Sequence, residues 1–374
     1  MAHDDVVSLF TELAALPSPP GDERAVADAV AAYMRDLGLD VSEDDAGEKI
    51  GSNAGNLYAR VEPTDGGTPL FLCAHLDTVP PVAGIEPVLE DGLIRNAAGT
   101  ILGADNKSAV AVMLEATRRL LVENRPHGGL ELLFTPMEET GLHGAAAFDH
   151  ERLHARIGYV YDQAAPIGEV ILGAPYSHSM QVKLHGRAAH SGMFPEEGRS
   201  AIAAAAKAIA DFKLGRLDEE TTANVGVIDG GTAGNIVPEW CTFLVDVRAH
   251  DPKKLADLVR EMLESITFAA SLEDCQAETD VHKSYNGYRF KRDDDVVRIA
   301  SSALEQSGFE PSFALSGGGA DANVFNERGL ACVNLANGMV DIHTPDERIA
   351  VADLERMVDV TLALVDVARE TDAA

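Results

Sequence analysis

The segment from Pro69 to Pro80, PLFLCAHLDTVP, contains five consecutive apolar residues followed by His75 and Asp77. An apolar run of this length between prolines is typical of a strand that is buried on both faces of a parallel sheet. Ligands of such sheets lie just beyond the carboxyl ends of the strands, so these two polar residues stand where chemistry usually occurs. Two interpretations stay open at this point. One is a metal-binding imidazole oriented by a carboxylate, and the other is a polar cap of the strand.

Two further apolar segments end in carboxylates. Glu138 and Glu139 follow a strand predicted over 130–137, and Asp162 follows a strand predicted over 157–161. Adjacent acids at the end of a buried strand repel one another unless a cation or a proton lies between them. The repetition of imidazole and carboxylate groups at such ends therefore predicts a metal site.

Asp105 lies in the motif ILGADNKS, directly before an apolar-periodic helix predicted over 109–122. An Asp in this place is commonly an ordinary helix N-cap. The same carboxylate could also bridge two cations, because the helix that follows fixes its backbone. The sequence around Asp105 leaves both roles open.

The order of elements predicts an α/β protein with an insertion. A chain of 374 residues exceeds the usual size of a single core. From residue 177 the pattern is β-α-β-β-α-β, which predicts a separate ferredoxin-like α+β domain. We therefore expect a mixed-sheet catalytic domain over 1–176 and 287–374, with a lid or dimerisation domain inserted at 177–286. Other elements predicted in the first part are helices over 4–16 and 22–37, a strand over 55–61 and a loop over 80–100.

Charge and composition exclude several classes of partner. The formal net charge is −31, and binding to nucleic acid or to an anionic membrane needs a basic surface. No apolar run approaches the roughly 20 residues of a membrane helix. The N-terminal segment lacks the features of a secretory signal, so we expect a cytoplasmic protein. The 4 Cys are scattered and predict no disulfide.

Five motifs occur in a fixed order along the chain: HLDTVP at His75, GADNK at Asp105, PMEETG at Glu138, the lone Asp162, and IHTPDE at His343. In this order they resemble the di-zinc hydrolases of the M20 peptidase family, and within it the peptidase T-like tripeptidases. The resemblance extends to GRAAHSGMFPEEGRSAI and GGTAGNIVPEW in the inserted domain. It implies a mixed-sheet zinc-peptidase fold.

The resemblance implies two zinc ions per chain, with cobalt or manganese as substitutes. The implied ligands are His75, Asp105 and Asp162 for one ion, and Asp105, Glu139 and His343 for the other. Asp105 would then bridge the two ions. The resemblance also implies that Asp77 orients His75 and that Glu138 is the general base.

The resemblance assigns the inserted domain a part in the site. His190 would donate to the oxyanion of a neighbouring subunit in a homodimer, and Asn235 and Arg248 would contact the substrate. Gly318, in the Gly317–Gly319 run, would let the backbone approach the substrate. Asn235 and Arg248 have simpler alternatives, since Asn235 could only turn the chain and Arg248 could pair with a surface acid.

The implied activity is hydrolysis of peptide bonds in short peptides, with release of the N-terminal residue of tripeptides. Asp162 supports this, because the family tends to have Asp at this position in aminopeptidases and Glu in deacylases and carboxypeptidases. Asn106 and Gln163 depart from the common pattern, which has Asp and Gly there. The alternatives are a deacylase or carboxypeptidase of the same family, or a non-catalytic binding relative.

Overall fold

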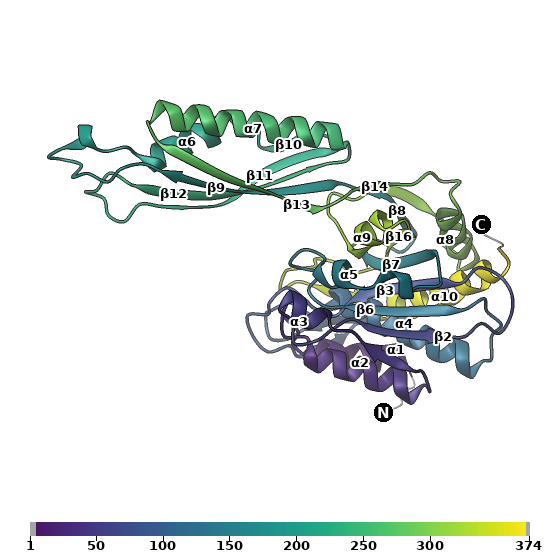
Figure 1. Cartoon of the computed structure of the whole chain (residues 1–374). Helices are drawn as coiled ribbons and strands as arrows, with labels where there is room; N and C mark the ends of the chain where they lie inside the picture. The colour runs from purple at the N-terminus through teal and green to yellow at the C-terminus, as the bar shows by residue number, and fades with distance from the viewer. Residues whose placement is uncertain (1–4, 372–374) are drawn as a thin grey trace. The chain divides into compact units, whose positions relative to one another are not determined.

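The computed structural model describes residues 5–371 and divides the chain into two compact units, whose elements are labelled in Figure 1. The main unit comprises the residues up to Gly173, Arg289–Ser316 and those from Ala320 onward. The inserted unit comprises Ala174–Tyr288 together with Gly317–Gly319. Position 4, the predicted start of the first helix, lies outside the described residues.

A nine-stranded mixed sheet organises the main unit, with strand order β1-β2-β6-β3-β7-β16-β8-β14 and β15 paired to β8. The strands at its centre are parallel: β3 pairs parallel with β6 and β7, and β16 pairs parallel with β7. All six residues of β3 are buried, as the apolar run predicts. The strands are β1 (Val41–Glu43), β2 (Leu57–Val61), β3 (Leu70–His75), β6 (Leu130–Thr135), β7 (Ile157–Gln163), β8 (Glu169–Ala174), β14 (Tyr288–Arg289), β15 (Ser312–Leu315) and β16 (Ala331–Ala336).

Helices cover both faces of this sheet (Figure 1). Successive side chains of β3 point to opposite faces of the sheet. Leu70 and Leu72 belong to the large core formed with α1, α4 and α10. The Phe71 ring lies on the other face and packs against Phe325 of α9. His75 has the same parity as Phe71 and therefore belongs to the α9 face. The helices are α1 (Val6–Ala14), α2 (Arg24–Asp36), α3 (Ala46–Ile50), α4 (Ala104–Val122), α5 (His143–Ala147), α8 (Asp295–Gln306), α9 (Asp321–Glu327) and α10 (Val351–Arg369).

The prediction of a loop over 80–100 is wrong. This stretch contains a hairpin of β4 (Pro87–Glu90) and β5 (Leu93–Asn96), which β17 (Arg348–Ala350) extends to three strands. Asp91 and Gly92 form the turn with φ of 50° and 77°. An Asp-Gly pair with positive φ at both residues is the preferred connection of a two-residue hairpin, so the signal was present in the sequence.

The inserted unit contains the β-α-β-β-α-β elements that the pattern predicts, and β10 adds a fifth strand that was not predicted. Its five strands lie in the order β10-β11-β12-β9-β13, and α6 and α7 pack on the sheet and against each other. The core strands are antiparallel, and β9 lies between β12 and β13. The elements are β9 (Tyr176–His185), α6 (Ala201–Asp211), β10 (Gly215–Asp218), β11 (Thr221–Gly230), β12 (Trp240–Ala249), α7 (Pro252–Leu272) and β13 (Gln276–Tyr285). Within residues 5–371, no helix combines the length and the apolar character needed to cross a membrane.

Candidate metal centre

The five predicted metal ligands converge at the carboxyl edge of the central strands of the main unit. His75 ends β3, Asp162 lies near the end of β7, and Glu139 follows β6. Asp105 comes from the start of α4, and His343 comes from the loop between β16 and β17. Parallel strands bring their carboxyl ends to one edge, which is why ligands far apart in sequence meet here.

Asp105 lies at the middle of the cluster. Its Oδ1 is 3.2 Å from His75 Nε2, and its Oδ2 is 3.2 Å from His343 Nε2. His343 Nε2 also lies 3.0 Å from Glu139 Oε1, and His75 Nε2 lies 3.9 Å from Asp162 Oδ1. Each oxygen of one carboxylate thus faces a different imidazole.

Two triads of these side chains offer ligand atoms that lie within 4.8 Å of one another, namely His75, Asp105 and Glu139, and His75, Glu138 and Asp162. Carboxylate oxygens and imidazole nitrogens together suit zinc and other first-row divalent ions. Glu138 belongs to the second triad, so its geometry allows a ligand role as well as the base role that the sequence predicts.

The electrostatics of the cluster fit bound cations. Burial, and then the neighbouring charge of Asp105, raise the pKa of Asp162 to about 7. Burial and the charge of Asp162 also raise the pKa of Glu138 well above its ordinary value. Hydrogen bonds to Asp105 and Glu139 raise the pKa of His343 to about 10. A cation beside Asp162 and Glu138 would favour their charged forms, so the donor set fits divalent metal ions.

The ring of His75 is oriented by the backbone of Asp77. His75 Nδ1 donates to the Asp77 carbonyl oxygen at 2.9 Å and lies 3.5 Å from Oδ1 of the Asp77 carboxylate. A carbonyl only accepts, so Nδ1 carries the hydrogen and Nε2 is left for a metal ion. The Asp77 carboxylate accepts instead from the amides of Glu138 and Glu139, both at 3.0 Å. Asp77 therefore also holds the segment that carries the two acids.

Three other buried charged groups near the cluster escaped sequence reasoning. Glu347 accepts from three backbone amides between Leu102 and Asp105, and Asp321 accepts from the Thr135 hydroxyl. Lys107 is fully buried and donates to the Leu16 carbonyl. Glu347 and Asp321 stand in the IHTPDE and SGGGAD segments, but their partners are far away in sequence, so no local pattern identifies them.

The residues predicted in the inserted unit form two groups at opposite ends of β12. His190 and Asn235 lie in paired loops, since His190 forms a bridge with Ile236 and the Ser191 amide donates to the Asn235 carbonyl at 3.1 Å. These loops adjoin the Trp240 end of β12, because the Gly186 amide donates to Glu239. Arg248 lies at the other end of β12.

At that end, Arg248 Nη1 donates to the Gly317 carbonyl at 3.3 Å. Gly318 belongs to the same glycine run, in which a Cβ at Gly319 would lie 2.5 Å from the Tyr285 ring. From Trp240 to Arg248 the strand spans about 26 Å at roughly 3.3 Å per residue. The structure therefore groups Arg248 with the glycine run and places His190 and Asn235 far from both.

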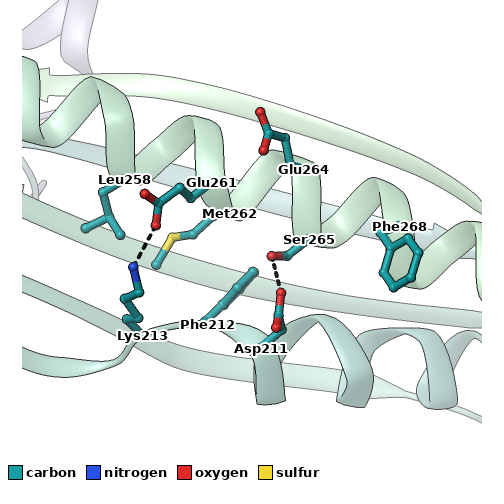
Figure 2. Close-up of a pocket in the computed structure, with 9 residues that line it drawn as sticks. All are labelled: Asp211, Phe212, Lys213, Leu258, Glu261, Met262, Glu264, Ser265 and Phe268. Carbon is teal, nitrogen blue, oxygen red and sulfur yellow. Dashed lines mark hydrogen bonds and ion pairs between the residues drawn. The ribbon is translucent and has the colours of Figure 1, made fainter.

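A pocket of about 400 Å³ in the inserted unit lies between α6 and α7 and contains none of the predicted site residues (Figure 2). An ion pair of 3.0 Å joins Lys213 to Glu261 across it, and Ser265 donates to Asp211. Four of its polar side chains are thus paired with one another. The pocket offers no catalytic arrangement.

Known proteins resemble this chain over nearly its whole length. The model of "Peptidase family M20/M25/M40" matches residues 71–367. A curated relative, "Uncharacterized protein YqjE" of Bacillus subtilis, is 37% identical and the match covers 96% of each chain. The crystal structure of aminopeptidase PepT from Bacillus cereus is 39% identical with a TM-score of 0.89, covering 97% of this chain and 98% of the other. A tripeptidase from Staphylococcus aureus is 35% identical with a TM-score of 0.94, covering 98% of both.

The resemblance seen in the five motifs is thereby confirmed, as is the expected α/β fold with a mixed sheet. The family match spans the segments that carry His75, Asp105, Glu139, Asp162 and His343. This chain belongs to peptidase family M20/M25/M40 and is a metallopeptidase.

Proposed function

We propose that this metallopeptidase is a di-zinc aminopeptidase that releases the N-terminal residue of tripeptides. Asp105 carries the proposal, because its two oxygens face His75 and His343 separately, as suits a carboxylate shared by two ions. His75, Asp105 and Asp162 would hold one ion. Asp105, Glu139 and His343 would hold the other.

When bound, the two ions would polarise the scissile carbonyl and favour ionisation of the attacking water. Glu138 is left as the proton carrier, since its carboxylate lies beside the ligands without being needed to complete either set. It would accept the proton of the attacking water and deliver it to the leaving amine. Asp77 keeps Glu138 in place through the amide of that residue, which donates to Asp77 at 3.0 Å.

The substrate class rests on similarity and on Asp162. The similar solved structures are titled an aminopeptidase PepT and a tripeptidase, and this chain covers 98% of each. Asp162 occupies the position where the resemblance implies Asp in aminopeptidases and Glu in deacylases. Both observations favour short peptides with a free amino terminus.

Free tripeptides should therefore be cleaved faster than the same tripeptides carrying an N-acetyl group. The physical reason is that a site which recognises a free ammonium leaves polar groups unpaired when that ammonium is blocked, and this typically costs a large factor in kcat/KM. Mass spectrometry of the products would show release of the N-terminal residue. Faster cleavage of the acetylated peptides would instead support the deacylase or carboxypeptidase alternative.

Metal removal should abolish activity, and zinc, cobalt or manganese should restore it, because every proposed ligand is nitrogen or oxygen. Metal analysis of the active protein should give about two ions per chain, as expected of a two-metal site. A protein that hydrolyses peptides with no bound metal would contradict the proposed chemistry.

A homodimer through the inserted unit is part of the proposal. Strand β10 pairs with β11 only at Thr221–Ala223, so among the described residues the rest of that edge of β11 has no strand beside it. Val227 and Ile228 on this stretch are 53% and 54% exposed. An unpaired apolar strand edge is a natural place for a second copy of the chain to add.

The inserted unit also supports a site shared between two subunits. Arg248 lies at one end of β12, and the loop of His190 adjoins the other end, at Trp240. From Trp240 to Arg248 the strand spans about 26 Å. An extended tripeptide reaches at most about 11 Å. If both residues contact one substrate, they must therefore come from different copies of the chain.

A further inference from the structure

We propose that Glu347 is a positioning residue, which fixes the shared carboxylate of Asp105 by clamping the backbone that leads to it. This inference rests on the proposed ligand set. Glu347 is not one of the proposed ligands, and both of its carboxylate oxygens accept from backbone amides.

The clamp consists of three hydrogen bonds. Glu347 Oε2 accepts from the amides of Leu102 at 2.7 Å and Gly103 at 2.8 Å. Glu347 Oε1 accepts from the amide of Asp105 at 3.0 Å. The side chain is buried, since Glu347 is only 2% exposed, so water does not compete for these bonds. Hydrogen bonds from amides to a buried carboxylate are among the stronger ones in proteins.

The backbone before α4 needs such a partner. Gly103 has φ of 78°, and Asp105 and Asn106 have non-helical dihedral angles although they lie within the bounds of α4. The regular helix therefore does not set the direction of the Asp105 side chain. Amides at the start of a helix also lack intrahelical acceptors. The Glu347 carboxylate is the acceptor for three amides in this segment.

Glu347 also joins two of the segments that supply ligands to the second proposed ion. It follows His343 by four positions, in a loop closed by two hydrogen bonds of 3.1 Å between Val340 and Arg348. Arg348 begins β17, which pairs with β5. The clamp therefore ties the Asp105 segment to the base of the loop that carries His343. Any shift of Glu347 would change the spacing of these two ligands.

The test is Glu347→Gln in the full chain. The substitution keeps the size of the side chain but replaces one acceptor oxygen with an amide nitrogen, which would face a backbone N–H. The matched control is Glu131→Gln. Glu131 in β6 is also 2% exposed, and it accepts from the amides of His154 and Ala155 and from the Tyr58 hydroxyl. None of these partners is a proposed metal ligand.

The measurements are the affinities for Zn²⁺, by competition with a chelator, and the absorption spectrum of the Co²⁺-loaded protein. We expect Glu347→Gln to weaken metal binding by about 10–100-fold, as is typical when a residue that orients a ligand is lost, and to alter the cobalt spectrum. Glu131→Gln should leave both unchanged. Equal metal affinity in the two variants would overturn the inference.

Asp105→Asn separates this inference from the proposed function. If Asp105→Asn keeps wild-type metal affinity, the proposed ligand set fails and the clamp fails with it. If Asp105→Asn loses metal while Glu347→Gln does not, only the clamp is overturned. Should Glu347→Gln not fold, Gly103→Ala tests the same backbone, because a side chain strains a φ of 78° while Glu347 stays intact. Wild-type metal affinity in that variant would also count against the clamp.

Discussion

Replacing Glu138 by Gln should lower kcat by about 10²–10⁴-fold while leaving the metal content at its wild-type value. Gln has nearly the same size and still accepts a hydrogen bond, but it cannot take up a proton at neutral pH. The backbone of residue 138 should stay in place, because the Asp77 carboxylate holds its amide and not its side chain. Steady-state kinetics and metal analysis on the same preparation provide the measurement.

Glu139→Gln is the matched comparison. This neighbour lies 3.0 Å from His343 Nε2 and is proposed as a ligand, so its substitution should reduce metal content as well as activity. Loss of metal in Glu138→Gln would contradict the base role. It would instead place Glu138 among the ligands, in the triad that it forms with His75 and Asp162.

Two inactive variants should restore activity when their subunits are mixed. His190→Ala should lose about 10²–10³-fold in turnover if His190 donates to the oxyanion, and Glu138→Ala should be inactive because it lacks the base. In a mixed dimer, the His190→Ala chain offers an intact base and the other chain offers an intact His190. With random exchange half the dimers are mixed and one of their two sites is complete, so activity should approach roughly a quarter of wild type.

The control for this experiment is His282→Ala. His282 is an exposed residue of β13 whose ring pairs with Asp280, and its loss should leave activity unchanged. Subunit exchange is verified separately with two distinguishable tags. If tagged heterodimers form and no activity returns, His190 serves its own chain or none, and the shared site is wrong while the metal chemistry is untouched.

The sequence alone was sufficient for the elements whose signal is local. The buried strand before His75 follows from five consecutive apolar residues, and the β-α-β-β-α-β order follows from the alternation of strand and helix patterns. Periodicity reports which side chains are buried within a few residues of one another. The hairpin of β4 and β5 has a local signal too, in the Asp91-Gly92 turn.

Tertiary structure alone decided which groups hold the site together. Glu347 is 245 residues from Leu102 in sequence, and nothing near either residue indicates that they bond. The same is true of the Asp77 carboxylate, which accepts from amides 61 and 62 residues away. A buried carboxylate needs donors, but only the folded chain determines which backbone amides reach it.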